Sequence, residues 1–361
     1  MAKKTSQPTT SSRQGKQRRK SSRSWFHRHQ LAVIIAVMAV VMMFGVAGFF
    51  GLEQHHGRDS WVRIPGGASS EQIHDSLRSA LGNAEGNRVF MLWRLANGRP
   101  SAARGYYMVP VGELSLQTAM RLRGGRQTPI RVGWTDVRTF DQLAGRIASR
   151  MEFTKDDFLA VADTLLPSLG YTPEQFPAAF IPDSYEFYAT DTPEQVVRRL
   201  VKYRDRYWTP ARVNQARGLG LTPVEAATLA SIVEEESGKA DERPVIARLY
   251  LNRLAAGMPL QADPTVKFAS GDFALRRIGA KQLAIDSPYN TYRRRGLPPG
   301  PIRIASKDGI EAVLAAPRHD FLYMCARADF SGYHDFAEDY ATHQANARRY
   351  QAELDRRGIK E

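Results

Sequence analysis

Cysteine is almost missing from this sequence, since Cys325 is the only one among 361 residues. No intramolecular disulfide can therefore form, and a zinc site made of clustered cysteines is excluded. Cys325 lies in the apolar run Phe-Leu-Tyr-Met-Cys-Ala, which is typical of a short strand, and we interpret it as a buried structural thiol rather than a nucleophile. His334 and His343 are nine residues apart, which fits no simple helical pair of ligands, so we predict no metal and no other cofactor.

Acidic residues are absent from the first 30 residues, where nine lysines and arginines lie. The net charge of the chain is +14, so taking away these nine leaves +5 for everything else. The segment is rich in Ser, Thr and Gln, a composition that predicts a disordered basic arm over 1–30. Aromatic side chains are not interleaved with the basic ones, and contact with anionic lipid headgroups is the simpler interpretation, so no nucleic-acid partner is predicted.

Charge of either sign is missing from residues 31–52, LAVIIAVMAVVMMFGVAGFFGL. At ~1.5 Å per residue, a helix of this length can cross a ~30 Å hydrocarbon layer. A cleavable signal peptide is the alternative, but its apolar core is only ~7 to 15 residues long, and no clear small-residue cleavage site follows here. Because Lys and Arg flank only the N-terminal side, we predict a single-pass protein of the cytoplasmic (inner) membrane, with the arm in the cytoplasm and the remainder extracytoplasmic, that is periplasmic.

Beyond a polar linker at 53–60, short strands and helices alternate. Trp61-Val-Arg-Ile-Pro and Tyr106-Tyr-Met-Val-Pro favour strands, and each is followed by an amphipathic helical pattern, SSEQIHDSLRSAL and ELSLQTAMRLRGG. Repeated units of this kind predict a compact α+β module over 61–127. A larger mixed α+β domain over 128–361 is expected to follow, so the fold class of the chain is α+β.

A helical hairpin is predicted within this larger domain. Thr222-Pro-Val-Glu combines a threonine cap, a proline at the first helical position and Glu225 at the third, which together mark a helix start. Gly238 is a stop signal, and a second helix is expected from near Glu242 to Gly257.

The first helix of the hairpin ends in three consecutive acids, and helical geometry separates them. At ~100° per residue, Leu229 and Ile232 lie within about 40° of Glu236, whereas Glu234 faces nearly the opposite way. A carboxyl on an apolar stripe is desolvated, which raises its pKa toward the range that a general acid needs. The alternative is a solvated helix end, and this is our interpretation of Glu234 and Glu235.

Three segments, which follow one another along the chain, carry a resemblance to a known family: LASIVEEESGKADERPVIARLYLNRL, GMPLQADPTVKFASG and SPYNTYRRRGLPPGPI. Together they closely resemble the endolytic murein transglycosylase family, known as MltG or YceG-like. The resemblance covers roughly Val62 to the C-terminus and is strongest from Leu221 to Ile302. The family pattern is Ile-Val-Glu-x-Glu-Thr/Ser with the second Glu catalytic, and this acid matches Glu236, with Ser237 beside it as a substrate-binding candidate.

The resemblance implies a lytic transglycosylase of peptidoglycan. Such an enzyme cleaves the bond between N-acetylmuramic acid and N-acetylglucosamine in nascent, uncrosslinked strands and leaves a 1,6-anhydro end, with Glu236 as the single general acid/base. The resemblance also implies that the module at 61–127 is LysM-like, that 128–361 is the catalytic YceG-like domain, and that peptidoglycan synthases lie nearby as partners.

Further residues are substrate-binding candidates in this context. Asp263 precedes a proline, which favours extended or turn geometry, so a turn-capping role is its alternative. The family usually has Thr or Ser where Ala262 stands, which removes one hydroxyl contact. The candidates for contact with the sugars are Gln261, Asp263, Thr265, Tyr289, Asn290 and Tyr292, although the tyrosines of such a loop can also serve only for packing. The family has a histidine and a phenylalanine that match His334 and Phe336, for which a structural or cleft-lining role is expected.

Two other functions fit parts of the sequence. A muramidase-type hydrolase would use Asp263 as a second carboxylate, ~5 to 9.5 Å from Glu236. A membrane tether without catalytic activity would use the module at 61–127 to bind peptidoglycan.

Overall fold

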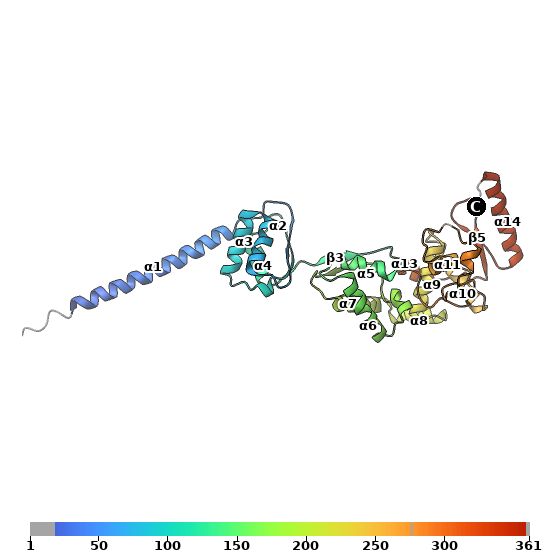
Figure 1. The fold of residues 1–361 in the computed structure, drawn as a ribbon, viewed down its shortest axis with the longest axis horizontal. Helices are drawn as coiled ribbons and strands as arrows, with labels where there is room; N and C mark the ends of the chain where they lie inside the picture. Colours follow the sequence, from blue (N-terminus) through green and yellow to red (C-terminus); the bar gives the residue numbers. More distant parts are fainter. Residues whose placement is uncertain (1–18, 276, 359–361) are drawn as a thin grey trace, which may run out of the picture. The chain divides into compact units, whose positions relative to one another are not determined.

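A computed structural model describes residues 19–275 and 277–358, and Figure 1 follows their helices and strands along the chain. The chain divides after Thr128 into two compact units, which are described separately below. Helices and short antiparallel strand pairs occur in both units, so the predicted α+β class is confirmed.

The first unit begins with the long helix α1 (Arg19–Gly51). Its most apolar window, His29–Val46, has a mean hydropathy of 2.3 and is nowhere buried, so by length and composition this helix could cross a membrane. The expected disordered arm over 1–30 is wrong for residues 19–30, because α1 already starts at Arg19. Lys and Arg are good helix formers, and extending an existing helix costs far less than starting one. Residues 1–18 lie outside the described part of the chain.

The rest of this unit folds around one antiparallel strand pair. Strand β1 (Ser60–Ile64) pairs with β2 (Gly105–Val109), and the two helices α2 (Ser70–Leu81) and α3 (Asn83–Leu95) lie between them in sequence. A short 3₁₀ turn, η1 (Pro100–Ala102), precedes β2, and α4 (Ser115–Arg123) follows it. A core that includes Val62, Leu77 and Trp93 holds these elements together.

Helix α3 was not predicted from the sequence. It starts directly after Gly82, whose φ of 84° ends α2, and it has no side-chain cap that would mark its beginning. It also contains Gly86, where a Cβ would lie 2.7 Å from the backbone of Arg78. Close contact between α2 and α3 therefore requires a residue that is unfavourable for helix formation.

The segment 53–60, expected to be a plain polar linker, is firmly attached to the first unit. The carbonyl of Glu53 accepts a hydrogen bond from the Ser115 backbone at 3.0 Å, and the His55 N–H donates to the Glu113 carbonyl at 2.8 Å. The His55 ring is buried and contacts the Glu85 carboxylate at 2.8 Å. This correction could not be read from composition, since the bonding partners lie 30 or more residues away in the sequence.

The second unit starts with a subdomain of helices around the antiparallel pair β3 (Ile130–Gly133) and β4 (Ser184–Phe187). Its core includes Phe158, Phe180 and Leu200. The other elements are α5 (Phe140–Ala148), α6 (Lys155–Ser168), η2 (Pro173–Ala179), α7 (Pro193–Tyr207) and α8 (Pro210–Gly218).

A second hydrophobic core of the same unit surrounds α9 (Pro223–Glu236) and α10 (Arg243–Ala255), so the predicted helical hairpin is confirmed. The Thr222 hydroxyl accepts a hydrogen bond from the Glu225 N–H at 3.2 Å, and the Glu225 carboxylate accepts one from the Thr222 N–H at 2.8 Å. The last elements are α11 (Asp263–Ser270), α12 (Ala280–Leu283), α13 (Lys307–Leu314), the antiparallel pair β5 (Tyr323–Ala326) and β6 (His334–Ala337), and α14 (Tyr340–Arg357).

Candidate active site

Helix α9 lies in the core, and its C-terminal end places Glu236 at the edge of that core. Every residue from Ala226 to Glu234 is buried, because α10, α11 and α13 all pack against this helix. Glu236 is the last helical residue, so its carboxyl emerges where the surrounding packing ends.

Glu236 borders a cavity of about 320 Å³. The residues that line it come from α9, α10, the segment before α11 and the first residue of α11, the loop after α12, the β5–β6 pair and α14: Glu236, Leu249, Tyr250, Arg253, Leu260, Gln261, Asp263, Tyr292, Met324, Cys325, Ala326, His334 and His343. Glu236, Gln261, Asp263 and Tyr292, all predicted site residues, therefore share one cavity.

The Glu236 carboxyl is desolvated, and this burial raises its pKa to about 7. The negative charge of Asp263 acts in the same direction. The Tyr250 hydroxyl opposes both by donating a hydrogen bond to Glu236 Oε1 at 2.7 Å, which favours the ionised form. Near neutral pH this carboxyl can therefore exist in either protonation state, as an acid/base catalyst requires.

Asp263 faces the same cavity in a fixed position. Its Oδ1 accepts a hydrogen bond from the Tyr292 hydroxyl at 2.6 Å. The expected extended or turn geometry is wrong, because Asp263 is the first residue of α11. Pro264 is tolerated in this first turn, where backbone N–H groups lack helical partners.

Gln261 is held beside them in an unusual backbone conformation with φ of 52°. Its N–H donates to the Thr291 carbonyl at 3.1 Å, and its side-chain oxygen accepts a hydrogen bond from Arg253 at 3.3 Å. Because Arg253 also donates to the backbone carbonyls of Pro259 and Leu260, it fixes the whole segment that leads to Asp263.

The other predicted sugar ligands do not line the cavity. Thr265 and Asn290 are fully buried, and Ser237 is only 2% exposed. Thr265 bonds to the Ala262 carbonyl, Asn290 bonds to the carbonyls of Leu283 and Ile285, and Ser237 donates to Glu242. These side chains hold the loops in place, and the predicted direct contact with substrate is incompatible with their burial.

Tyr289, also predicted to contact sugar, lies outside this cavity. Its ring packs against Phe268 with ring centroids 4.7 Å apart, and burial raises the pKa of its hydroxyl to about 12. The alternative, in which a loop tyrosine serves for packing, describes its environment better.

The sequence interpretation missed Tyr250 on the cavity wall and expected Cys325 to be more deeply buried than it is. Tyr250 belongs to the helix that was predicted correctly, and a tyrosine on a buried helix face is itself a signal, since its hydroxyl needs a partner. Cys325 is half-buried and borders the cavity rather than being fully enclosed, although burial still raises the pKa of its thiol. His334 has a cleft-lining place, as expected, with its Nδ1 2.8 Å from the Glu242 carboxylate.

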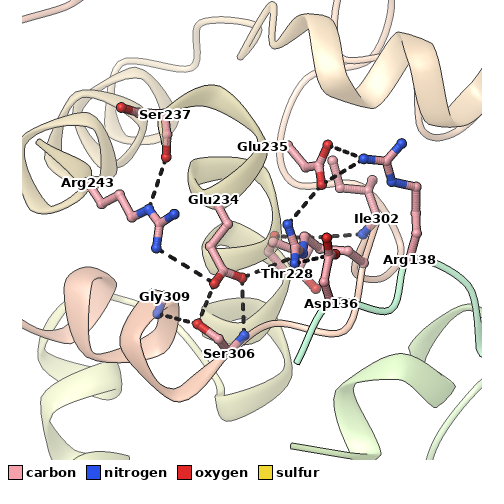
Figure 2. Close-up of polar contacts among 12 residues, drawn as sticks. Asp136, Arg138, Thr228, Glu234, Glu235, Ser237, Arg243, Ile302, Ser306 and Gly309 are labelled. Carbon is pink, nitrogen blue, oxygen red and sulfur yellow. Dashed lines mark hydrogen bonds and ion pairs between the residues drawn. The ribbon is translucent and has the colours of Figure 1, made fainter. Parts of the chain in front are cut away.

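Glu234 and Glu235 are not a solvated helix end, and that interpretation is wrong. Figure 2 shows both carboxylates in a network that joins α9 to α13 and to the loop after β3. Glu234 is buried and accepts hydrogen bonds from the backbone and the hydroxyl of Ser306. Glu235 pairs with Arg138 at 2.8 Å and with Arg303 at 3.0 Å. The two charges are therefore used to fix the helix that carries Glu236.

Comparison with known proteins identifies the family of the chain. The chain belongs to the YceG-like family, whose model matches residues 62–349, so the predicted family is confirmed. It is 28% identical over 289 residues to an endolytic murein transglycosylase of Bacillus subtilis, covering 74% of this chain and 79% of that protein.

Two further relatives extend the match. The chain is 26% identical over 340 residues to an endolytic murein transglycosylase of Streptococcus pneumoniae, covering 82% of this chain but only 61% of the pneumococcal protein. The crystal structure of a YceG-like protein from Listeria monocytogenes superposes with a TM-score of 0.53 at 26% identity, covering 80% of this chain and 98% of that one.

Proposed function

We propose that this protein is an endolytic peptidoglycan lytic transglycosylase that cleaves the bond between N-acetylmuramic acid and N-acetylglucosamine. The observation that carries the proposal is a single desolvated carboxyl, Glu236, with a pKa of about 7 on the wall of a polar cavity. The names of the Bacillus and Streptococcus relatives support the same reaction class.

In the proposed mechanism Glu236 acts twice. As the neutral acid it protonates the leaving glycosidic oxygen, and as the resulting carboxylate it accepts the proton of the sugar's C6 hydroxyl. Attack by that oxygen on the anomeric carbon closes the 1,6-anhydro ring, so no water is consumed. The Tyr250 hydroxyl stabilises the carboxylate between the two steps, through the hydrogen bond to Oε1.

A muramidase-type hydrolase is the second candidate, because Asp263 faces the same cavity as Glu236. In that reaction Asp263 would serve as nucleophile or as base for a water molecule. The hydrogen bond from Tyr292 favours a positioning role for this carboxylate, since it fixes one of the two oxygens that a nucleophile or base would use.

Digestion of defined, uncrosslinked glycan strands tests the proposal. Mass spectrometry of the products should show anhydro ends from the native protein and no products from the Glu236→Gln variant. Products heavier by one water would instead establish the hydrolase, and turnover by Glu236→Gln would remove the acid/base role. Unchanged strands with both proteins, combined with retained binding, would support a tether.

We also propose that α1 spans the cytoplasmic membrane once, with the residues after it on the extracytoplasmic side, and that residues 61–127 are a LysM-like module that contacts the cell wall. The apolar window of α1 and the separate core around the β1–β2 pair support these assignments. Protease digestion of intact and of permeabilised cells tests the orientation, since the second unit should be accessible from outside the cytoplasmic membrane.

A further inference from the structure

The first unit is attached to α1 without a free linker, and the contacts fix the direction in which two of its helices run. His55 bonds to Glu113, Glu53 bonds to Ser115, and a Cβ placed on Gly51 would lie 3.1 Å from Leu116. The segment 51–55 therefore runs antiparallel to the start of α4, so α4 runs from its first residue toward the side where α1 enters the unit.

Helix α3 runs the same way. Glu85 contacts His55, and Arg88, one turn later, pairs with Glu53 at 3.3 Å. Both α3 and α4 also pack against α1 itself. Their C-terminal ends consequently lie on the side of the unit where α1 enters.

Each of these helices has an outward apolar stripe, and the stripe on α4 ends in an arginine. On α4 the stripe consists of Leu116, Met120 and Arg123, at the i, i+4 and i+7 positions of one helix face. On α3, Met91 and Leu95 are one turn apart. The side chains of Leu95 and Leu116 are 55% and 40% exposed.

The α4 stripe and the turn that follows α3 border a depression of about 490 Å³, whose lining includes Met120, Arg99, Arg123 and Arg126 and no acidic side chain. All three arginines are exposed, and within residues 19–275 and 277–358 none of them has an ion-pair partner. The local sequence has the same bias, since residues 86–128 contain seven arginines and only one acid, Glu113. Glu113 is already paired with Arg121 at 2.7 Å.

We propose that this face, formed by the two stripes and the arginine depression, rests on the anionic surface of the bilayer that holds α1. Leu95, near the C-terminal end of α3, would enter the headgroup region, and Arg99, Arg123 and Arg126 would bind lipid phosphate groups. The inference depends on the proposed membrane anchorage of α1. We infer the bilayer as the partner because α1 continues directly into this unit, so the face lies close to the point on α1 where its apolar window ends.

Fluorescence quenching of the full chain in lipid nanodiscs tests this contact. Single cysteines replace Leu95, Asp75 or Val37 in a Cys325→Ser background, and each carries the same fluorophore. Asp75 lies exposed on α2 and is the matched control, and Val37 lies in the apolar window of α1. Lipids with a nitroxide on the headgroup or on the acyl chain quench only fluorophores that reach them.

Quenching of the label at position 37 establishes the anchorage independently of the inference. With about one-third phosphatidylglycerol in phosphatidylcholine, the label at position 95 should then lose most of its fluorescence and the label at position 75 little. The triple substitution R99S/R123S/R126S should reduce quenching at position 95, and so should replacing the phosphatidylglycerol with phosphatidylcholine. Equal quenching at positions 95 and 75, or quenching at 95 that is insensitive to both changes, would overturn the proposal.

Discussion

The hydrogen bond from Tyr250 to Glu236 makes a quantitative prediction about the pH dependence of the proposed reaction. Glu236 must carry a proton when the reaction starts, so kcat/KM should be constant below its pKa of about 7 and fall tenfold per pH unit above it. Tyr250→Phe removes the hydroxyl that stabilises the ionised form, at 2.7 Å from Oε1. The pKa of Glu236 should therefore rise, and the alkaline limb should move to higher pH.

The size of the movement follows from hydrogen-bond energies. A hydrogen bond to a charged group contributes ~1.5 to 3 kcal/mol and one to a neutral group ~0.5 to 1.5 kcal/mol, so the ionised form loses roughly 1 kcal/mol more than the neutral form. At ~1.4 kcal/mol per pKa unit, the limb should shift upward by about one unit. At pH 8 the variant should then keep roughly half of its own plateau activity, and the native protein about a tenth.

Activity profiles between pH 5 and pH 9 on uncrosslinked glycan strands measure this shift. Asp263→Asn removes a negative charge that raises the pKa of Glu236, so its limb should move to lower pH, opposite to Tyr250→Phe. Tyr207→Phe is a matched control, because the Tyr207 hydroxyl donates to the Glu311 carboxylate at 2.9 Å outside the cavity. An alkaline limb that stays in place in Tyr250→Phe, or moves the same way in Asp263→Asn, would refute the assignment of Glu236 as the titrating acid.

Three further predictions concern stability. The folded-state pKa of Glu236, about 7, lies above its unfolded value of 4.5, so the unfolded state loses its proton first and the native protein loses stability as pH rises from 4.5 to about 7. Thermal unfolding should therefore show Glu236→Gln to be more stable than the native protein by about 3 kcal/mol at pH 8, with the difference vanishing below pH 4.5. Gly309→Ala would place a Cβ 2.5 Å from the Glu234 carboxyl carbon and should lower the free energy of unfolding by about 1 to 3 kcal/mol. Gly218→Ala has open space around its Cβ and should raise the free energy of unfolding by about 0.5 to 1 kcal/mol. Equal effects of the two substitutions in chemical denaturation would contradict the packing argument. Glu235→Gln leaves Arg138 without its carboxylate, whereas Arg303 still pairs with Asp136 at 2.9 Å, so the unfolding midpoint should fall by an amount equivalent to about 1 to 3 kcal/mol. An unchanged midpoint would show that the ion pairs of Glu235 contribute nothing to stability.

Local signals predicted the elements that carry the site. The threonine cap and proline before Val224 marked the start of α9, and the periodicity of the helix separated Glu236 from Glu234. These features depend on residues three or four positions apart, so they are visible in a linear sequence. Helix α3 was missed because its start has no such local signal.

Local sequence signals could not decide which individual polar residues around the site contact substrate and which hold the fold together. Asn290 and Thr265 have side chains that suit a sugar ligand, yet both bond to backbone carbonyls within the fold. Whether a polar side chain faces a cavity or holds a loop depends on neighbours far along the chain, and its chemical type is the same in both cases. The acid triplet illustrates the same limit, since the partners of Glu235 are 97 and 68 residues away.

The sequence alone determined the apolar helix near the N-terminus, the capped hairpin, the family and the choice of Glu236, because each depends on a pattern within a short segment. The tertiary structure decided that Tyr250, Asp263 and Tyr292 line the same cavity as Glu236. The same structure decided that Glu234 and Glu235 bond to distant segments and so hold α9 in place. It also decided that the segment after α1 is bound to α4. These are contacts between segments distant in the chain, and they exist only because burial of the two cores brings those segments together.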